Sequence, residues 1–185
     1  MAVNSESEKT VLRLWLLLRR VGDALMLCQD SIFGQYGLTT EQWGVLTSIK
    51  SRGPLRPTDL ASILERSANS ISMLVDRMVK AGLVRRIRDR SDRRVVHVVN
   101  TSKGENALKP ATQASLAVIR KILPQSYEDK STLLSLLGTI KYEILTYLNP
   151  EMDIEEVKRE ELEQAANVKE WLNKYDLSST PQVKR

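Results

Sequence analysis

The sequence predicts a mainly α-helical protein with one small β-hairpin, and two patterns support this class. Apolar residues recur at three- and four-residue steps over most of the 185-residue chain, which is the period of amphipathic helices. The stretch 84–99 departs from that period, because β-branched residues stand there on both sides of a polar Arg-Ser-Asp-Arg turn. We therefore expect helices before and after a single hairpin.

The first predicted helix runs from Glu8 to about Phe33, where glycines follow. Its apolar residues occupy several faces, and Trp15 and Leu16 lie outside the main stripe. A helix that is apolar over so much of its circumference must be covered by more than one neighbour. A second subunit is a natural candidate for that cover.

Two shorter helices are predicted next. Thr39 or Thr40 can cap the first of them, which ends at Gly53-Pro54. Pro57 suits the first position of the other helix, because the N–H that proline lacks has no partner there. This helix reaches about Glu65.

A further helix is expected between Arg66-Ser67 and Gly82. At about 100° per residue, four apolar residues share one side and polar residues lie opposite; the apolar four are Ile71, Leu74, Val75 and Met78. Two short helices with a tight turn, and the small Ala61 where they cross, predict a helix-turn-helix whose second helix can enter a major groove.

The hairpin that follows is strongly basic. Six arginines and two aspartates lie between Val84 and Arg94, a net charge of +4. Residues 50–103 carry +8, whereas the segments 1–49, 104–149 and 150–185 carry −1, +1 and −3. This distribution favours nucleic acid or another polyanion as partner, and a merely solvated basic face is the alternative. Joined to the helix-turn-helix, the hairpin predicts a winged helix-turn-helix lobe.

Helices are predicted on the C-terminal side as well. One begins at Thr101 or Ser102 and reaches about Leu123, and a second spans Gln125 to Leu148. Their apolar stripes indicate a core and a dimer seam rather than a cofactor site, and no cofactor is expected. A weaker helix falls within 151–175, and residues 178–185 are expected to be disordered. The predicted division is 1–36 N-terminal dimerisation helix, 37–103 DNA-binding lobe, 104–150 C-terminal dimerisation helices and 151–185 additional helix and tail.

Composition argues against several other classes. The single Cys28 rules out an internal disulfide framework and suits a reducing compartment. No signal peptide is evident, and the apolar run Leu14–Leu18 is far shorter than the ~20 residues of a membrane span. We expect a cytoplasmic protein. One histidine and one cysteine argue against a His/Cys metal site within a chain.

The candidate DNA contacts divide by the chemistry of their side chains. Short polar side chains and a methionine near the start of the recognition helix can face base edges, and these are Ser67, Asn69, Ser70, Ser72 and Met73. Cations on the same helix are expected to meet phosphate, and these are Arg66, Arg77 and Lys80.

The wing supplies a second set of candidates. Arg90 and Arg93, near its tip, are candidates for the minor groove, where a narrow A·T tract concentrates negative potential. Arg94 can contact DNA directly or hold the shape of the hairpin through an ion pair with Asp92. Arg88 is a candidate contact that can equally be a solvated strand residue, as can Arg85 and Arg86.

Across roughly residues 39–104 the sequence resembles the MarR family of bacterial and archaeal winged-helix regulators. The matching pieces occur in order at the family's separations: Leu60-Ala61, Leu74-Val75-Asp76-Arg77, Ala81-Gly82-Leu83-Val84-Arg85-Arg86, Asp92-Arg93-Arg94, and Thr101 with Gly104. The resemblance implies a homodimer with interleaved first and last helices and two lobes set for a pseudo-palindromic operator. It further implies a repressor that releases DNA when a small, often aromatic, anion occupies a cleft between lobe and dimer region.

Two features depart from the family. Asn100 stands where leucine is usual, so the end of the second strand is expected to be less apolar. Residues 151–175 are an addition to the family's usual length. They can brace the dimer or, through their negative charge, contact a basic lobe.

Three other functions remain as alternatives. An enzyme is disfavoured because the sequence has no glycine-rich phosphate loop, no metal-ligand pair and no nucleophile beside a histidine. The others are a winged-helix protein-interaction module and an activator or ligand-independent regulator. Cys28 is read as an inert buried thiol, with redox sensing as the second reading, and His97 is read as structural.

Overall fold

The computed structural model describes residues 5–89 and 91–173, which form seven helices and a two-stranded antiparallel sheet. Arg90, a predicted minor-groove contact, and the tail 178–185, predicted to be disordered, lie outside the described residues. None of the helices in the two described ranges is long and apolar enough to cross a bilayer. The elements are α1 Ser5–Gly34, α2 Thr40–Arg52, α3 Pro57–Ile63, α4 Ala68–Lys80, β1 Val84–Arg88, β2 Val96–Asn100, α5 Ser102–Ile122, α6 Tyr127–Leu148 and α7 Ile154–Asn173.

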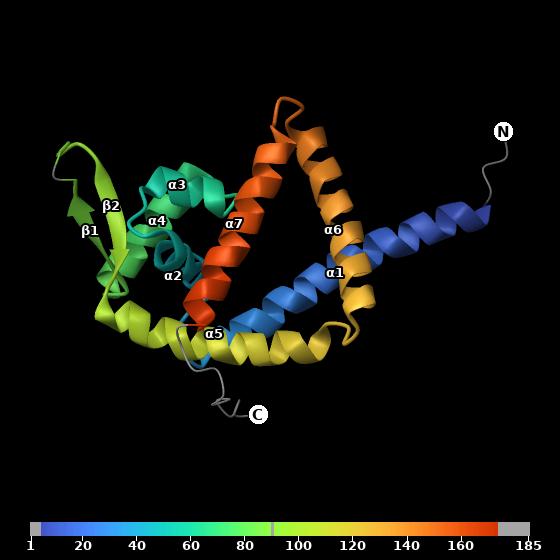
Figure 1. The fold of residues 1–185 in the computed structure, drawn as a ribbon, viewed down its shortest axis with the longest axis horizontal. Coiled ribbons are helices and arrows are strands. Elements are labelled where there is room, and N and C mark those ends of the chain that lie inside the picture. Colours follow the sequence, from blue (N-terminus) through green and yellow to red (C-terminus); the bar gives the residue numbers. More distant parts are fainter. Residues whose placement is uncertain (1–4, 90, 174–185) are drawn as a thin grey trace.

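The long helices frame a small lobe made of α2, α3, α4 and the sheet (Figure 1). α5 runs along one side of the molecule, and α6 and α7 leave its far end and return toward it, so that the three outline a triangle (Figure 1). α1 packs against α2 and α5 at its C-terminal end, and its N-terminal half projects past α6 (Figure 1). The mainly helical class with a small β-wing is thereby confirmed.

Side-chain caps begin α2 and α5 at positions that the sequence predicted. Thr39 forms a capping box with Gln42, accepting from its backbone N–H while the Gln42 side chain accepts from the Thr39 N–H. Thr101 accepts from the Gly104 N–H at the start of α5, and Pro57 occupies the first turn of α3. These caps satisfy donors that a helix N-terminus otherwise leaves without partners.

The sheet pairs the two wing strands and adds a short third segment. β1 and β2 run antiparallel, with Val84 opposite Asn100 and Arg88 opposite Val96. Leu55 bridges to Val98 through two backbone hydrogen bonds of 3.2 and 2.7 Å, so one extended residue before α3 adds to the sheet. The wing is therefore fastened to the helix-turn-helix at its base.

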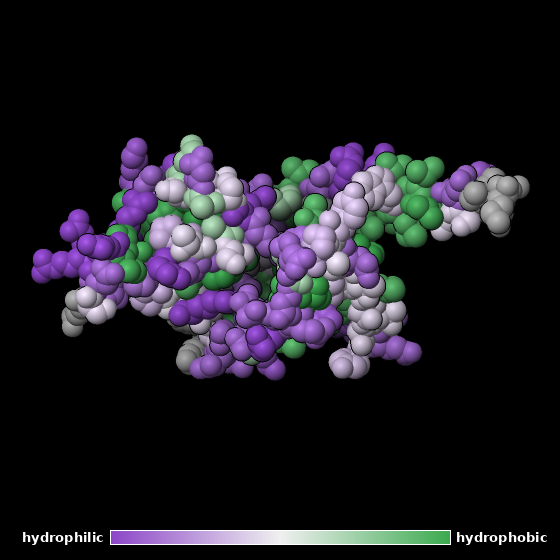
Figure 2. Space-filling view, turned by 90° about the horizontal axis from the view of Figure 1, so that it is seen from above, coloured by the Kyte–Doolittle hydropathy of each residue, from purple (hydrophilic) through white to green (hydrophobic). Residues whose placement is uncertain are grey.

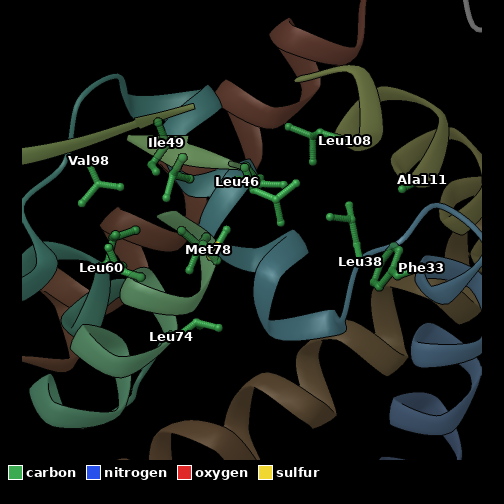
Figure 3. Close-up of a cluster of buried hydrophobic side chains, with 14 of the residues drawn as sticks. Phe33, Leu38, Leu46, Ile49, Leu60, Leu74, Met78, Val98, Leu108 and Ala111 are labelled. Carbon is green, nitrogen blue, oxygen red and sulfur yellow. The ribbon is translucent and has the colours of Figure 1, made fainter. Parts of the chain in front are cut away.

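One continuous hydrophobic core joins the lobe to α1 and α5 (Figure 3). Leu60 and Met78 are fully buried inside the helix-turn-helix, whereas Phe33 of α1 and Leu108 of α5 fill the far side of the same cluster. The four residues predicted to form the apolar side of α4 are all buried, namely Ile71, Leu74, Val75 and Met78. Because the core is shared, the orientation of α4 depends on α1 and α5 as well as on its own lobe.

Asn100 ends β2 in a polar network. Its Nδ2 donates to the Leu46 carbonyl oxygen at 3.0 Å and to Glu105 Oε1 at 2.9 Å, and Glu105 forms an ion pair with Lys50 at 2.5 Å. The less apolar strand end that the sequence predicted is therefore packed through hydrogen bonds between β2, α2 and α5.

The additional C-terminal helix folds back onto its own lobe. α7 lies against α2 and α6, and Trp171 near its C-terminal end is only 7 % exposed within the main core. The segment therefore contacts its own lobe through an apolar side chain and also lies against α6. That it braces a dimer, or that its negative charge contacts a basic lobe, stays a prediction.

Candidate nucleic-acid interface

α4 presents a polar face to solvent, because its apolar residues are used by the core. Asn69, Met73 and Lys80 lie near the middle of the exposed face at helical spacing, and all three are exposed. Nothing in the described part of the chain covers this face. Its side chains are the kinds that can read base edges and meet phosphate in a major groove.

The start of α4 is held by Ser67. Its Oγ accepts from the Ser70 backbone N–H at 3.2 Å and lies 2.8 Å from the Ser70 Oγ. Ser67, one of the predicted base contacts, therefore has a structural use as the N-cap, and its hydroxyl is shared with Ser70. Its contact with DNA stays a prediction.

The two edges of the exposed face of α4 differ. On the wing side, Asp76 accepts from Arg86 of β1 at 2.6 Å, an ion pair that joins helix and wing. Arg86 therefore has a structural partner instead of being only a solvated strand residue. On the opposite edge, Ser70 and Arg77 face a cleft beside α2.

The wing loop is organised by Asp89. Its Oδ1 accepts from the Ser91 N–H at 2.7 Å, the Ser91 hydroxyl at 2.5 Å and the Asp92 N–H at 3.1 Å. The hydrogen bond from the Ser91 hydroxyl, with those from the two backbone N–H groups, lowers the pKa of Asp89 to about 2. His97 Nδ1 stands 4.0 Å from the other carboxylate oxygen, and the structural role of His97 stays a prediction.

The proposed ion pair between Asp92 and Arg94 is not formed. Asp92 Oδ1 accepts instead from the Arg94 backbone N–H at 2.9 Å, and the guanidinium makes no ion pair with a described residue. The turn is closed by backbone N–H groups that donate to the Asp89 and Asp92 carboxylates. Arg88, Arg93 and Arg94 are all exposed, so these three arginines of the wing are available to an external anion.

A cleft of about 430 Å³ lies between α4, α2 and α1. Four predicted DNA contacts line it: Arg66, Ser70, Met73 and Arg77. Its apolar wall includes Met26 of α1 and Trp43 of α2. Trp43 stacks on Phe33 of α1 at a centroid distance of 4.9 Å and donates from Nε1 to Thr112 of α5 at 2.8 Å. A ligand in the cleft would therefore contact the recognition helix α4 and also Trp43, which links α2 to α1 and α5.

Several of these residues could not be found from the sequence. In the sequence Met26 and Trp43 look like ordinary apolar residues of their helices. Only the packing of α1 on α2 shows that both side chains line a cleft. Asp89 had a recognisable signal, because an aspartate two residues before a serine in a polar turn can accept from the following backbone N–H groups.

An exposed apolar surface lies away from the lobe (Figure 2). Along the projecting half of α1, Leu12 and Trp15 are 61 % and 65 % exposed, and α6 has no buried residue although it is rich in leucine and isoleucine. Exposed apolar side chains gathered in this way are typical of an interaction surface.

Residues 38–96 match the model of the MarR family. The HTH-type transcriptional regulator PecS of Dickeya dadantii is 27 % identical over 128 residues, a match that spans 67 % of this chain and 77 % of PecS.

Two solved structures extend the comparison. A MarR family protein from Bacillus stearothermophilus is 27 % identical with a TM-score of 0.61, over 78 % of this chain and 99 % of that one. A mutant MarR from E. coli, complexed with operator DNA, has a TM-score of 0.64 over 71 % of this chain and 95 % of that one. At 22 % identity the latter is evidence of a shared fold.

Proposed function

Because the chain belongs to the MarR family of winged-helix transcriptional regulators, we propose that it is a homodimer that represses transcription by binding a pseudo-palindromic DNA operator. The observation that carries the proposal is the exposed polar face of α4 beside a wing in which three exposed arginines, Arg88, Arg93 and Arg94, form no ion pair with a described residue. With +8 on residues 50–103, this surface suits the phosphates on either side of a groove.

In this proposal α4 enters the major groove and the wing follows the adjacent minor groove. Asn69 is suited to pair bidentately with adenine, and Met73 to contact a thymine methyl group. Arg66, Arg77 and Lys80 would meet phosphate, and Arg93 would enter the minor groove with Arg90. Ser70 and Ser72 can hydrogen-bond to either kind of base pair.

The exposed apolar surfaces of α1 and α6 support the dimer. Two copies that cover these surfaces would present two recognition helices, and a two-fold dimer reads a pseudo-palindrome. The predicted division into dimerisation helices, lobe and additional helix remains part of this proposal. Like other members of a family of regulators, the protein would act on DNA in the cytoplasm and without enzymatic activity.

The cleft beside α4 is the proposed effector site. Its apolar wall with Trp43 and its two cations, Arg66 and Arg77, suit a small aromatic anion. Such a ligand would engage side chains that the proposal assigns to DNA, so ligand and operator would compete for the same residues. Linkage then requires that each weakens the binding of the other.

The proposal is tested by selecting bound duplexes from a random pool and titrating the winner, with a scrambled duplex as control, at several salt concentrations. A pseudo-palindrome with half-sites about one helical turn apart is expected. Arg93→Ala should weaken operator binding by about 1 to 3 kcal/mol, the range for a good groove contact. Substituted benzoates added to the same titration should release the operator, and unchanged binding would remove the effector from the proposal.

Equal affinity of the winner and the scrambled duplex, with a steep salt slope, would mean that the arginines hold only phosphates. Unchanged affinity of Arg93→Ala for both duplexes would remove Arg93 from the interface. Full function after replacement of both Arg90 and Arg93 by alanine would favour a protein-interaction module.

A further inference from the structure

One lysine in the middle of α6 stands between two carboxylates from different parts of the molecule. Lys141 Nζ is 2.9 Å from Glu65 Oε1 and forms a second ion pair with Glu161 of α7. Glu65 belongs to the turn of the helix-turn-helix, between α3 and α4. A single ammonium group thus connects α6, α7 and the turn that precedes the recognition helix.

The Glu65 turn is well placed to orient α4. Glu65 has a backbone φ of 51°, in the left-handed region that residues with a side chain rarely adopt. The turn is closed by hydrogen bonds from the Glu65 N–H to Ser62 O at 3.1 Å and from the Arg66 N–H to Ala61 O at 2.9 Å. Ser67, the N-cap of α4, follows two residues after Glu65, so a force on this carboxylate acts close to the start of the recognition helix.

The other side of the junction is anchored on α7. Partial burial opposes the charge on Glu161, but hydrogen bonds from Lys141 and Tyr142 outweigh it and lower the pKa of Glu161. The Tyr142 hydroxyl lies 2.8 Å from Glu161 Oε2. α7 is itself held by Trp171, which is buried in the core. Glu161 therefore holds Lys141 from a fixed support.

We propose that Lys141 is a positioning residue for DNA recognition, which holds the start of α4 in one orientation relative to the α6–α7 hairpin. This inference rests on the proposed function, because the orientation of two lobes in a dimer sets the separation of the half-sites that they read. The three side chains are partly exposed, so their ion pairs contribute little to global stability. A small interaction free energy is nevertheless enough to favour one orientation of the lobe over other orientations close to it.

A simpler role for Lys141 is to join α6 to α7 alone. The two roles differ in what they require of Glu65. If Lys141 only joins the two helices, removing the charge of Glu65 changes nothing, because the pair with Glu161 remains. If Lys141 positions the turn, Glu65→Gln and Lys141→Met should have the same effect.

The test uses the full chain and a set of operators whose half-site spacing differs by single base pairs. Wild type should prefer one spacing, and Lys141→Met and Glu65→Gln should each reduce that preference by about two- to fivefold, the factor expected for a partly exposed ion pair. Lys141→Arg should restore it. Lys158→Met is the matched control, because Lys158 pairs with Glu155 and lies 5.2 Å from the Tyr142 ring centroid without an ion pair to Glu65.

A second measurement needs no DNA. Hydrogen–deuterium exchange of the Glu65 and Arg66 amides, which close the turn, should accelerate in Lys141→Met and Glu65→Gln and stay at the wild-type rate in Lys158→Met. Wild-type exchange and spacing preference in Glu65→Gln would overturn the positioning role. If exchange is faster in Lys141→Met and Glu65→Gln but the wild-type protein binds no operator, the role of Lys141 in holding the turn would stand and the proposed function would be rejected.

Discussion

At the tip of the wing, the Asp89 carboxylate holds the loop through hydrogen bonds, as a capping side chain holds the start of a helix. Asp89 accepts three hydrogen bonds from the loop that follows it, and these bonds favour its ionised form. Its pKa of about 2 lies below the ordinary value of 3.8. A carboxyl group with a lowered pKa stabilises the folded loop above its unfolded pKa, and that contribution is lost as the pH falls through the folded value.

We therefore predict that the Asp89 carboxyl carbon, followed by NMR, titrates near pH 2. The order of the wing loop should be constant from neutral pH to about pH 4 and decline below it. Asp89→Ala should loosen the loop and weaken operator binding at neutral pH, whereas Asp89→Asn, which keeps an acceptor oxygen, should retain more of it. An ordinary pKa near 3.8 would show that the loop hydrogen bonds do not form in solution.

At the scale of elements, the contact between α5 and the end of the recognition unit leaves no room for a side chain at Gly104. A Cβ placed there would lie 2.2 Å from the Leu83 carbonyl oxygen and 2.9 Å from Leu46 Cδ2. Thr101 tightens the same junction, because its hydroxyl donates to the Gly82 carbonyl oxygen at 2.6 Å. The backbone of α5 therefore approaches the turn after α4 directly.

Gly104→Ala should consequently destabilise the protein by about 1 to 3 kcal/mol, as overpacked cores do, although alanine is the better helix former. The measurement is urea unfolding followed by circular dichroism. Gly138→Ala on α6 is the control, because its Cβ would meet Tyr142 at an ordinary 3.5 Å. The control should be neutral or more stable by up to about 1 kcal/mol, and equal effects of the two substitutions would contradict the close packing.

The elements could be predicted where local chemistry decides them. Thr39, Pro57 and Thr101 mark helix starts through groups that cap or lack an N–H, and the period of Ile71, Leu74, Val75 and Met78 identifies the buried side of α4. Long-range partners could not be predicted in this way. The pairing of Asp76 with Arg86, the junction at Lys141 and the cleft beside Trp43 each join segments whose contact depends on the complete fold.

For the molecule as a whole, the unequal distribution of apolar surface is the main consequence of this architecture. The lobe buries its apolar residues in a core shared with α1 and α5, but the first half of α1 and most of α6 remain exposed (Figure 2). The sequence anticipated this imbalance, since it predicted α1 to be apolar on several faces. It could not show that α7 would cover the lobe and leave these surfaces free.

We predict that the full chain sediments as a dimer at micromolar concentration. Leu12→Glu or Trp15→Glu should raise the dimer dissociation constant by about 100-fold or more, since burying an unpaired carboxylate costs several kcal/mol. Leu162→Glu on α7, where the leucine is 73 % exposed, is the matched control and should leave the dimer intact. If α1 forms the dimer seam, loss of the dimer should also lower operator affinity, because one lobe then reads only one half-site. If the wild-type chain is a monomer at these concentrations, α1 and α6 do not form a dimer, and any DNA binding must come from a single lobe.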